Sequence, residues 1–266
     1  MSAIFDHIAA NYDDSFTYTH TGKLQRQLVW NHLNQSLPSS PLNVLETNCG
    51  TGEDALYLAA KGHQVIATDI SEEMVIQTRL KVQKAARSIR VEICSIQKSL
   101  QQFGTHQFDL IFSNFGGFNC VSPRDLSAWA QHVPQLLTAN GRIILVIMPT
   151  YCIWESIAFL KKFNFKAAFR RSTRKAVRAI VGQEKMPIWY YSPRQIKALF
   201  STHFQVRAIK PIGFFLPPSY LDTYFHNKNN LLRRFYKLDQ FIEHARVSAS
   251  LSDHFLIDLQ LRSRSY

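Results

Sequence analysis

The sequence predicts an α/β fold in which a mostly parallel β-sheet carries helices on both of its faces. Between residues 42 and 149, apolar segments of strand length alternate with amphipathic segments of helix length. A glycine turn follows the first of these strands and leads directly into a helix. With 266 residues, 46% of them hydrophobic, the chain is long enough to bury the core of such a domain. This alternation is typical of parallel strands whose crossover helices cover both sheet faces.

The first 40 residues are predicted to form a helical lid before the sheet. Residues 3–12 and about 22–36 have amphipathic helical patterns, and the stretch LPSSP ends the second helix. The beginning of the chain carries acidic residues and lacks a basic segment followed by an apolar one, so we expect no signal peptide there.

The α/β core is predicted to span residues 41–150. The expected strands are LNVLET, QVIATD, RVEIC, FDLIFSN and RIILVIMP, at residues 42–47, 64–69, 90–94, 108–114 and 142–149. The expected helices lie at residues 52–62, 71–86 and 122–141. Ser71 is a favourable N-cap residue, whereas Pro134 should kink the third helix.

Two regions follow the core. Residues 151–191 are predicted to be a helical, basic and aromatic insertion that forms a cap over the substrate site, with helix expected throughout 151–182. Residues 192–266 should complete the core and add helices between 217 and 248. The strands expected in this last region are FQVRAIKPI at 204–212 and SDHFLIDLQLR at 252–262.

The composition excludes several classes of protein and site. The formal net charge is +12, and residues 1–150 hold 11 Lys and Arg against 12 Asp and Glu, whereas 151–266 hold 20 against 7. No apolar run reaches the roughly 18 residues of a membrane span. The four cysteines lack CxxC spacing, so no metal site or disulfide framework is predicted, and reduced thiols in a cytoplasmic protein are expected.

The glycine turn after the first strand is the main candidate ligand site, and the residues alone leave its ligand open. A phosphate-binding P-loop would need a Lys and a Ser or Thr directly after its last glycine, and none stands there. A dinucleotide is still compatible with the turn. Gly50, Gly52 and Ala55 fit the pattern GxGxxA, and Asp69 follows Gly50 by 19 residues.

The stretch VLETNCGTGEDALYLAAKGHQVIATDIS, residues 44–71, resembles motif I and the acidic loop of the class I S-adenosylmethionine-dependent methyltransferases. FDLIFSN resembles the strand-four motif of the same family. The resemblance covers about residues 40–150, resumes in the closing strands, and implies S-adenosylmethionine as the cofactor. It also implies a seven-stranded sheet in which residues 252–261 form one reversed strand, inserted between the strands near 143–149 and 204–210.

The resemblance assigns a set of residues to the cofactor. They are Tyr12, Glu46, Asn48, Gly50, Gly52, Asp69, Ile70, Met74, Ser95, Ile96 and Asn114. Asp69 is expected to accept hydrogen bonds from both ribose hydroxyls, and Glu46 to act near the amino group of the cofactor. Asn48 replaces the first glycine of the family motif. Ser95 or the backbone at Ile96 stands where many members have an Asp that binds the adenine amine.

The acceptor is predicted to be a small, partly apolar molecule. Asn114, beside the transferring end of the cofactor, and His20, as a possible base, are the catalytic candidates. The predicted acceptor contacts are Phe115, Phe118, Asn119, Tyr151, Trp154, Tyr190 and Tyr220. In the enzymes that methylate amino groups of DNA bases and of glutamine, two prolines follow the position of Asn114. Here Phe115 and Gly116 follow it, which argues against those substrates. The alternatives are an RNA methyltransferase and an NAD(P)-binding oxidoreductase.

Residues 161–178 interleave basic and aromatic side chains, and three interpretations fit this pattern. The first is a solvated helix face. The second is a weak contact with an anionic membrane surface or a lipid substrate. The third is RNA binding, which ranks lower because no recognisable RNA-binding module accompanies it. The sequence leaves the oligomeric state open.

Overall fold

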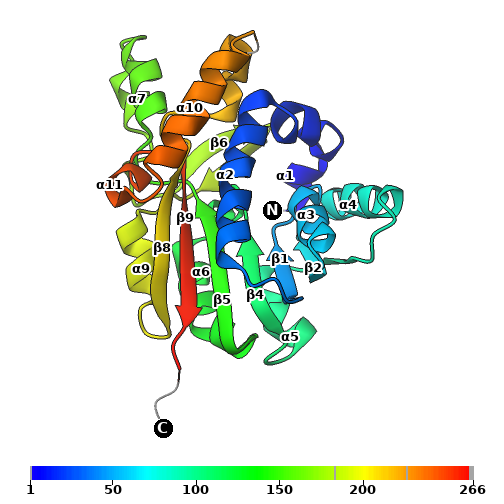
Figure 1. Cartoon of the computed structure of the whole chain (residues 1–266). Coiled ribbons are helices and arrows are strands. Elements are labelled where there is room, and N and C mark those ends of the chain that lie inside the picture. Colours follow the sequence, from blue (N-terminus) through cyan, green and yellow to red (C-terminus); the bar gives the residue numbers. More distant parts are fainter. Residues whose placement is uncertain (1, 183, 226, 264–266) are drawn as a thin grey trace.

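Seven strands form one sheet at the centre of the molecule (Figure 1). The computed structural model describes residues 2–182, 184–225 and 227–263. The strands of this sheet are β1 (Asn43–Thr47), β2 (Gln64–Asp69), β3 (Arg90–Ile93), β4 (Phe108–Ser113), β5 (Leu137–Ile147), β8 (Phe204–Ile212) and β9 (His254–Leu261). Their order is β3-β2-β1-β4-β5-β9-β8, and β9 runs antiparallel to both of its neighbours. The predicted topology is confirmed, because the other strand pairs are parallel.

Helices cover both faces of this sheet, as the sequence predicts. They are α1 (Ser2–Asp6), α2 (His20–Ser36), α3 (Glu53–Ala60), α4 (Glu72–Lys84), α5 (Ser99–Phe103), α6 (Pro123–His132), α7 (Ile153–Leu160), α8 (Phe165–Ala168), α9 (Pro193–Phe200), α10 (Asn229–Phe241) and α11 (Arg246–Ala249). Serine side chains cap the starts of three of them. Ser71, Ser122 and Ser192 each accept a hydrogen bond from a backbone N–H of the first helical turn.

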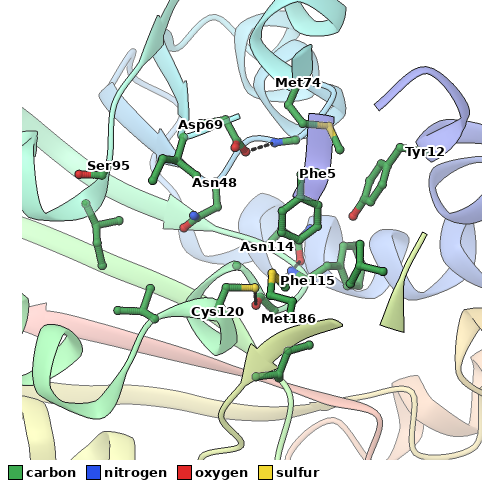
Figure 2. A pocket seen from close by; sticks show the side chains of 18 of the residues that line it. Phe5, Tyr12, Asn48, Asp69, Met74, Ser95, Asn114, Phe115, Cys120 and Met186 are labelled. Atoms are coloured by element: carbon green, nitrogen blue, oxygen red, sulfur yellow. Dashed lines mark hydrogen bonds between the residues drawn. The ribbon is translucent and has the colours of Figure 1, made fainter. Parts of the chain in front are cut away.

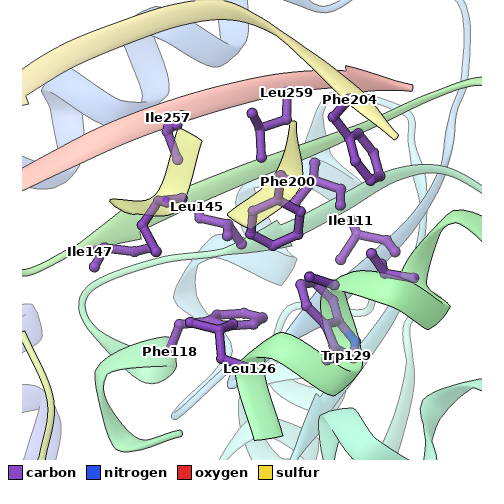
Figure 3. Packing of buried hydrophobic residues seen from close by; sticks show 14 of the residues in the cluster. Ile111, Phe118, Leu126, Trp129, Leu145, Ile147, Phe200, Phe204, Ile257 and Leu259 are labelled. Atoms are coloured by element: carbon purple, nitrogen blue, oxygen red, sulfur yellow. The ribbon is translucent and has the colours of Figure 1, made fainter. Parts of the chain in front are cut away.

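The hydrophobic core lies in two layers, one on each side of the sheet. Neighbouring strand residues point to opposite layers: Val44 packs with α2, α3, α4 and α10, whereas Leu45 packs with α6 and α9. Figure 3 shows the second layer, in which Phe118, Trp129 and Phe200 pack against aliphatic side chains of β4, β5 and β9. Both faces of the central strands are therefore dry, which explains their nearly continuous apolar sequences.

Two predicted helices are shorter than expected. The helix expected at 122–141 ends at His132, and Pro134 lies in a 3-10 turn that leads into β5 at Leu137. A proline ring cannot continue an α-helix, so it ends the helix rather than bending it. The helix expected at 3–12 ends at Asp6, and a 3-10 turn at Ala9–Asn11 and a π-helical turn at Asp13–Thr17 follow it.

The insertion is helical only in its first half, so the prediction of helix throughout 151–182 is wrong. β6 (Val177–Val181) and β7 (Glu184–Ile188) form a separate antiparallel hairpin. Gly182 begins its turn at φ +62°, a conformation that glycine adopts without strain. Burial alternates along β6, and Met186 and Ile188 of β7 are buried. Among the described residues, none of the helices has the length and hydropathy needed to cross a membrane.

Candidate functional site

A cavity of about 260 Å³ opens where the carboxyl ends of β1, β2 and β4 meet. The strand order reverses direction between β1 and β4, and open α/β sheets bind their ligands at such a point. The predicted residues that line it are Tyr12, Asn48, Gly50, Asp69, Ile70, Met74, Ser95, Ile96, Asn114 and Phe115. Figure 2 labels seven of these side chains, which surround one space although they come from separate segments of the chain.

The glycine turn gives the cavity its floor. Asn48, Gly50 and Gly52 all have a left-handed backbone, with φ of 57°, 55° and 80°. Asparagine tolerates this conformation better than most residues, which explains how it replaces a glycine. At Gly52 a Cβ atom would lie 2.4 Å from a side-chain carbon of Thr78, so the close packing of the turn on α4 requires glycine.

Asp69 is held at the edge of the cavity by two backbone amides. The Gly50 N–H donates to Oδ2 at 2.9 Å, and the Ser71 N–H donates to Oδ1 at 3.0 Å. Burial raises the pKa of Asp69 to about 6, although these hydrogen bonds lower it. Each carboxylate oxygen keeps lone pairs free for further donors. The side chain is therefore oriented to accept hydrogen bonds from a ligand.

Glu46 lies buried within β1 and does not line the cavity. One of its carboxylate oxygens, Oε2, is buried with no hydrogen-bond partner among the described residues. Burial and then the nearby Asp54 raise the pKa of Glu46 well above 4.5, whereas Arg26 lowers it. A buried carboxyl group with an unpaired oxygen is costly, so its place beside the turn calls for a donor that the described residues do not supply.

A polar recess of about 30 Å³ adjoins the cavity beside the glycine turn, and sequence reasoning missed several of its residues. Arg26, from α2, pairs with Asp54 of α3, and the Asn114 amide donates to the same carboxylate at 3.1 Å. Arg26 Nε and Thr17 Oγ1 are buried without a partner in the described part of the chain. No local motif marks these residues, because they meet only through the packing of α2 on α3.

The other side of the cavity is apolar. Its wall comprises Phe5, Cys120, Val121, Met148, Val181, Met186 and Ile188. Phe5 belongs to α1, and three of these residues belong to the β6–β7 hairpin. Burial raises the pKa of Cys120 to about 12, so its thiol is neutral. Val181 lies in the segment that was predicted to be helical, and Met186 and Ile188 follow that segment. The glycine at 182, between two short segments, was the available signal for a hairpin.

Several predicted acceptor residues lie away from this cavity. Phe118 is part of the hydrophobic core, and the Asn119 amide donates to the carbonyl oxygens of Met148 and Trp189. Tyr190 is buried beneath the Arg171 guanidinium. These side chains support the cavity wall from behind, so their predicted contact with an acceptor is not supported by the geometry.

The remaining predicted residues outside the cavity are held by other contacts. The Trp154 indole donates to the carbonyl oxygens of Phe214 and Phe215. Tyr220 donates to Glu155 at 3.4 Å. Tyr151 is exposed. His20 is also exposed, at the start of α2, and its imidazole does not line the cavity. Gly52 does not line the cavity and serves only to shape the glycine turn.

The model of the Methyltransferase domain family matches residues 44–141. The chain is 29% identical over 147 residues to a demethylmenaquinone methyltransferase of Clavibacter sepedonicus, covering 54% of this chain and 56% of the relative. It is 30% identical over 105 residues to a tRNA 5-carboxymethoxyuridine methyltransferase of Escherichia coli K12, covering 38% of this chain and 40% of the relative. The chain thus spans about half the length of these curated relatives.

Solved structures share the fold over nearly the whole chain. The 1,6-didemethyltoxoflavin-N1-methyltransferase of Burkholderia thailandensis, solved with S-adenosylhomocysteine, matches with a TM-score of 0.55 and 15% identity. The match covers 98% of this chain and 88% of that one. The reversed β9, the glycine turn and the family match agree with one another. Residues 44–141 therefore carry a methyltransferase domain, and the sheet of the described chain has the fold of the class I S-adenosylmethionine-dependent methyltransferases.

Proposed function

We propose that the chain binds S-adenosylmethionine across the polar recess and the cavity, and methylates a small, largely apolar molecule held against the hairpin wall. The observation that carries this proposal is the division of the site. Unpartnered polar atoms gather beside the glycine turn, whereas the opposite wall is formed by apolar side chains. A zwitterionic cofactor end and an apolar acceptor match these two halves.

The polar atoms of this chain fit the cofactor. Arg26 Nε and Thr17 Oγ1 are free to donate to the carboxylate of its methionine part, and Glu46 offers an acceptor for the ammonium group. Asp69 accepts from the ribose hydroxyls. The adenine would lie among Ile70, Met74, Ser95 and Ile96, which line the same cavity. S-adenosylmethionine supplies the methyl group when bound.

The residues around the acceptor wall act by orientation. The Cys120 thiol is neutral, and the exposed His20 lies outside the cavity, so we assign neither as a base. Asn114 is fixed by its bond to Asp54 and bounds the junction of the two halves of the site. An acceptor atom that is already nucleophilic needs little more than correct positioning and exclusion of water, which the apolar wall provides.

The relatives support two classes of acceptor, a small molecule and RNA. The similarity to a demethylmenaquinone methyltransferase supports a small-molecule acceptor. The tRNA methyltransferase relative, together with the positive charge of residues 151–266, supports RNA as the second candidate. The apolar wall favours the first. A dinucleotide oxidoreductase does not agree with the reversed β9.

Calorimetric titration separates these cofactor classes. We expect saturable binding of S-adenosylhomocysteine and no saturable heat with NADH at the same concentrations, because the recess is built for an amino acid end rather than a pyrophosphate. Transfer of labelled methyl groups to pooled small hydrophobic extracts, compared with bulk RNA, then identifies the acceptor class. Saturable NADH binding without S-adenosylhomocysteine binding would contradict the proposal.

The Glu46→Gln variant is expected to weaken S-adenosylhomocysteine binding by about tenfold, or about 1.4 kcal/mol, because the ammonium group loses a charged partner. The unliganded protein should not lose stability. Since the folded pKa of Glu46 is raised, its ionisation destabilises the fold as the pH rises above 4.5, and glutamine removes this pH dependence. Glu72→Gln, an exposed change on α4, is the matched control. Equal affinity for the Glu46→Gln variant and the wild type would exclude Glu46 from the site.

A further inference from the structure

Apolar side chains line the outside of the insertion in a continuous stripe. Ile153, Ile157 and Leu160 are exposed on α7 at helical spacing, and Phe163 continues the stripe into the next turn. Phe163 is 83% exposed and Phe165 is 63% exposed. Large aromatic side chains are rarely left in water to this extent, and such a group of them usually marks a contact surface. We call residues 157–169 the α7–α8 tip.

The charge of the α7–α8 tip is entirely positive. Lys161, Lys162 and Lys166 are exposed around the two phenylalanines. No acidic residue occurs in the sequence between 156 and 183. The preceding acid, Glu155, is buried and already bonded to Arg170 and Arg171, so it does not neutralise these lysines.

We infer that the α7–α8 tip docks on an anionic membrane surface. Basic side chains are attracted to acidic lipid headgroups, and exposed Phe, Ile and Leu side chains gain free energy by entering the boundary with the acyl chains. In Figure 1, α7 projects at one end of the molecule, beside α10 and clear of the sheet. Trp154 packs against Phe235 of α10, with ring centroids 6.0 Å apart, which braces the base of the projection.

A membrane explains this surface better than RNA does. Aliphatic side chains such as Ile157 and Leu160 offer no face on which a base can stack, whereas they suit a lipid interface. The same insertion also continues into the β6–β7 hairpin, whose Met186 and Ile188 form part of the acceptor wall. This link rests on the proposed function: an apolar acceptor dissolved in a membrane would be met by the segment that helps to enclose it.

Vesicle co-sedimentation of the full chain tests the inference without any cofactor. The probes are vesicles of phosphatidylcholine alone and of phosphatidylcholine with 30% phosphatidylglycerol. The variants are Phe163→Ser with Phe165→Ser, and Lys161→Gln with Lys162→Gln and Lys166→Gln. The matched controls are Phe241→Ser, which changes an 87% exposed phenylalanine outside the tip, and a triple Lys→Gln change of exposed Lys61, Lys84 and Lys197.

We expect the wild type and both controls to bind the anionic vesicles, and both tip variants to bind at least tenfold more weakly. Binding should weaken with added salt and be low on neutral vesicles. No binding by the wild type, or losses as large in the controls as in the tip variants, would overturn the inference. A second outcome would assign the surface to a polyanion instead. In it, both tip variants bind vesicles as well as the wild type does, and binding to tRNA is lost in the lysine variant but kept in the phenylalanine variant. S-adenosylhomocysteine titration of the same variants keeps this outcome separate from failure of the proposed function.

Discussion

Replacing Arg171 with methionine is expected to lower the free energy of unfolding by about 3–5 kcal/mol. Arg171 is buried between two acidic residues that belong to distant parts of the chain. Its guanidinium bonds Glu155 of α7 at 2.8 Å and Asp253, just before β9, at 3.1 Å. It also donates to the Asp253 carbonyl oxygen at 3.0 Å. Methionine would fill most of the space but leave both carboxylates buried with less compensation.

Urea unfolding at neutral pH measures this effect. The matched control is Arg174→Met, an exposed change three residues further on, which should alter stability by no more than about 0.5 kcal/mol. A similar small change for Arg171→Met would mean that water or other side chains solvate the two carboxylates. Arg171→Lys should recover part of the loss, because one charge remains although the bidentate geometry does not.

The pH dependence of the same comparison has a definite sign. Burial alone would raise the pKa of Asp253, but His254 and Arg171 hold it well below 3.8. A depressed folded pKa stabilises the protein above the unfolded pKa, and this stabilisation is lost as the pH falls. The difference in free energy of unfolding between the wild type and Arg171→Met should therefore be largest at neutral pH and become smaller below pH 3.8.

The buried Arg171 also shows what charge counting misses. The basic residues of 161–178 look alike in the sequence, and a solvated helix face was one interpretation of them all. In the structure, Arg171 and Glu155 form an internal link, whereas Lys161 and Lys162 face water. The partners of Arg171 lie 16 and 82 residues away along the chain, so no local pattern identifies them.

The sheet could be predicted because its signals are local. Continuous apolar strands, serine caps and a glycine turn each lie within a few residues, and β1 to β4 follow them closely. β5 begins at Leu137, five residues before its predicted start. The hairpin at 177–188 has a weaker local signal, a glycine between two short segments, and helix was predicted up to residue 182. Its position over the cavity depends on packing with the segment that follows α1, where a Cβ on Gly182 would lie 2.8 Å from a side-chain carbon of Ile8. Such a contact between distant segments is not encoded by periodicity.

The candidate site divides in the same way. Asn48, Gly50 and Asp69 lie within one strand–turn–helix–strand unit, and the local sequence pattern together with the resemblance identified them. Arg26 and Thr17 come from the segment before the sheet, and their relation to the turn appears only when α2 packs on α3. The acceptor candidates were chosen for aromatic character, but Trp154 and Tyr190 are used for packing. Aromatic composition alone therefore does not distinguish a binding wall from a supporting layer.

Replacing Asp69 with alanine is expected to weaken S-adenosylhomocysteine binding by about 1.5–3 kcal/mol, because the ribose hydroxyls lose a charged acceptor. Asp69 also orders the Gly50 and Ser71 amides, so unfolding must be measured alongside calorimetry to show that the turn persists. Glu72→Ala is the matched control, since it removes one nearby negative charge that is exposed on α4. Equal losses of affinity in Asp69→Ala and Glu72→Ala would mean that Asp69 acts only through its negative charge near the site and not through a hydrogen bond to the ligand.

The pH dependence of binding separates a direct bond from an indirect one. The pKa of Asp69 is raised to about 6 in the free protein, and the ionised carboxylate is the better acceptor for the hydroxyls. Affinity of the wild type should therefore fall as the pH is lowered from 7.5 to 5, because protonation at Asp69 competes with binding. The ratio of wild-type to Asp69→Ala affinity should shrink over the same interval. A ratio that stays constant through pH 6 would show that the carboxylate does not touch the ligand and acts only by holding the glycine turn.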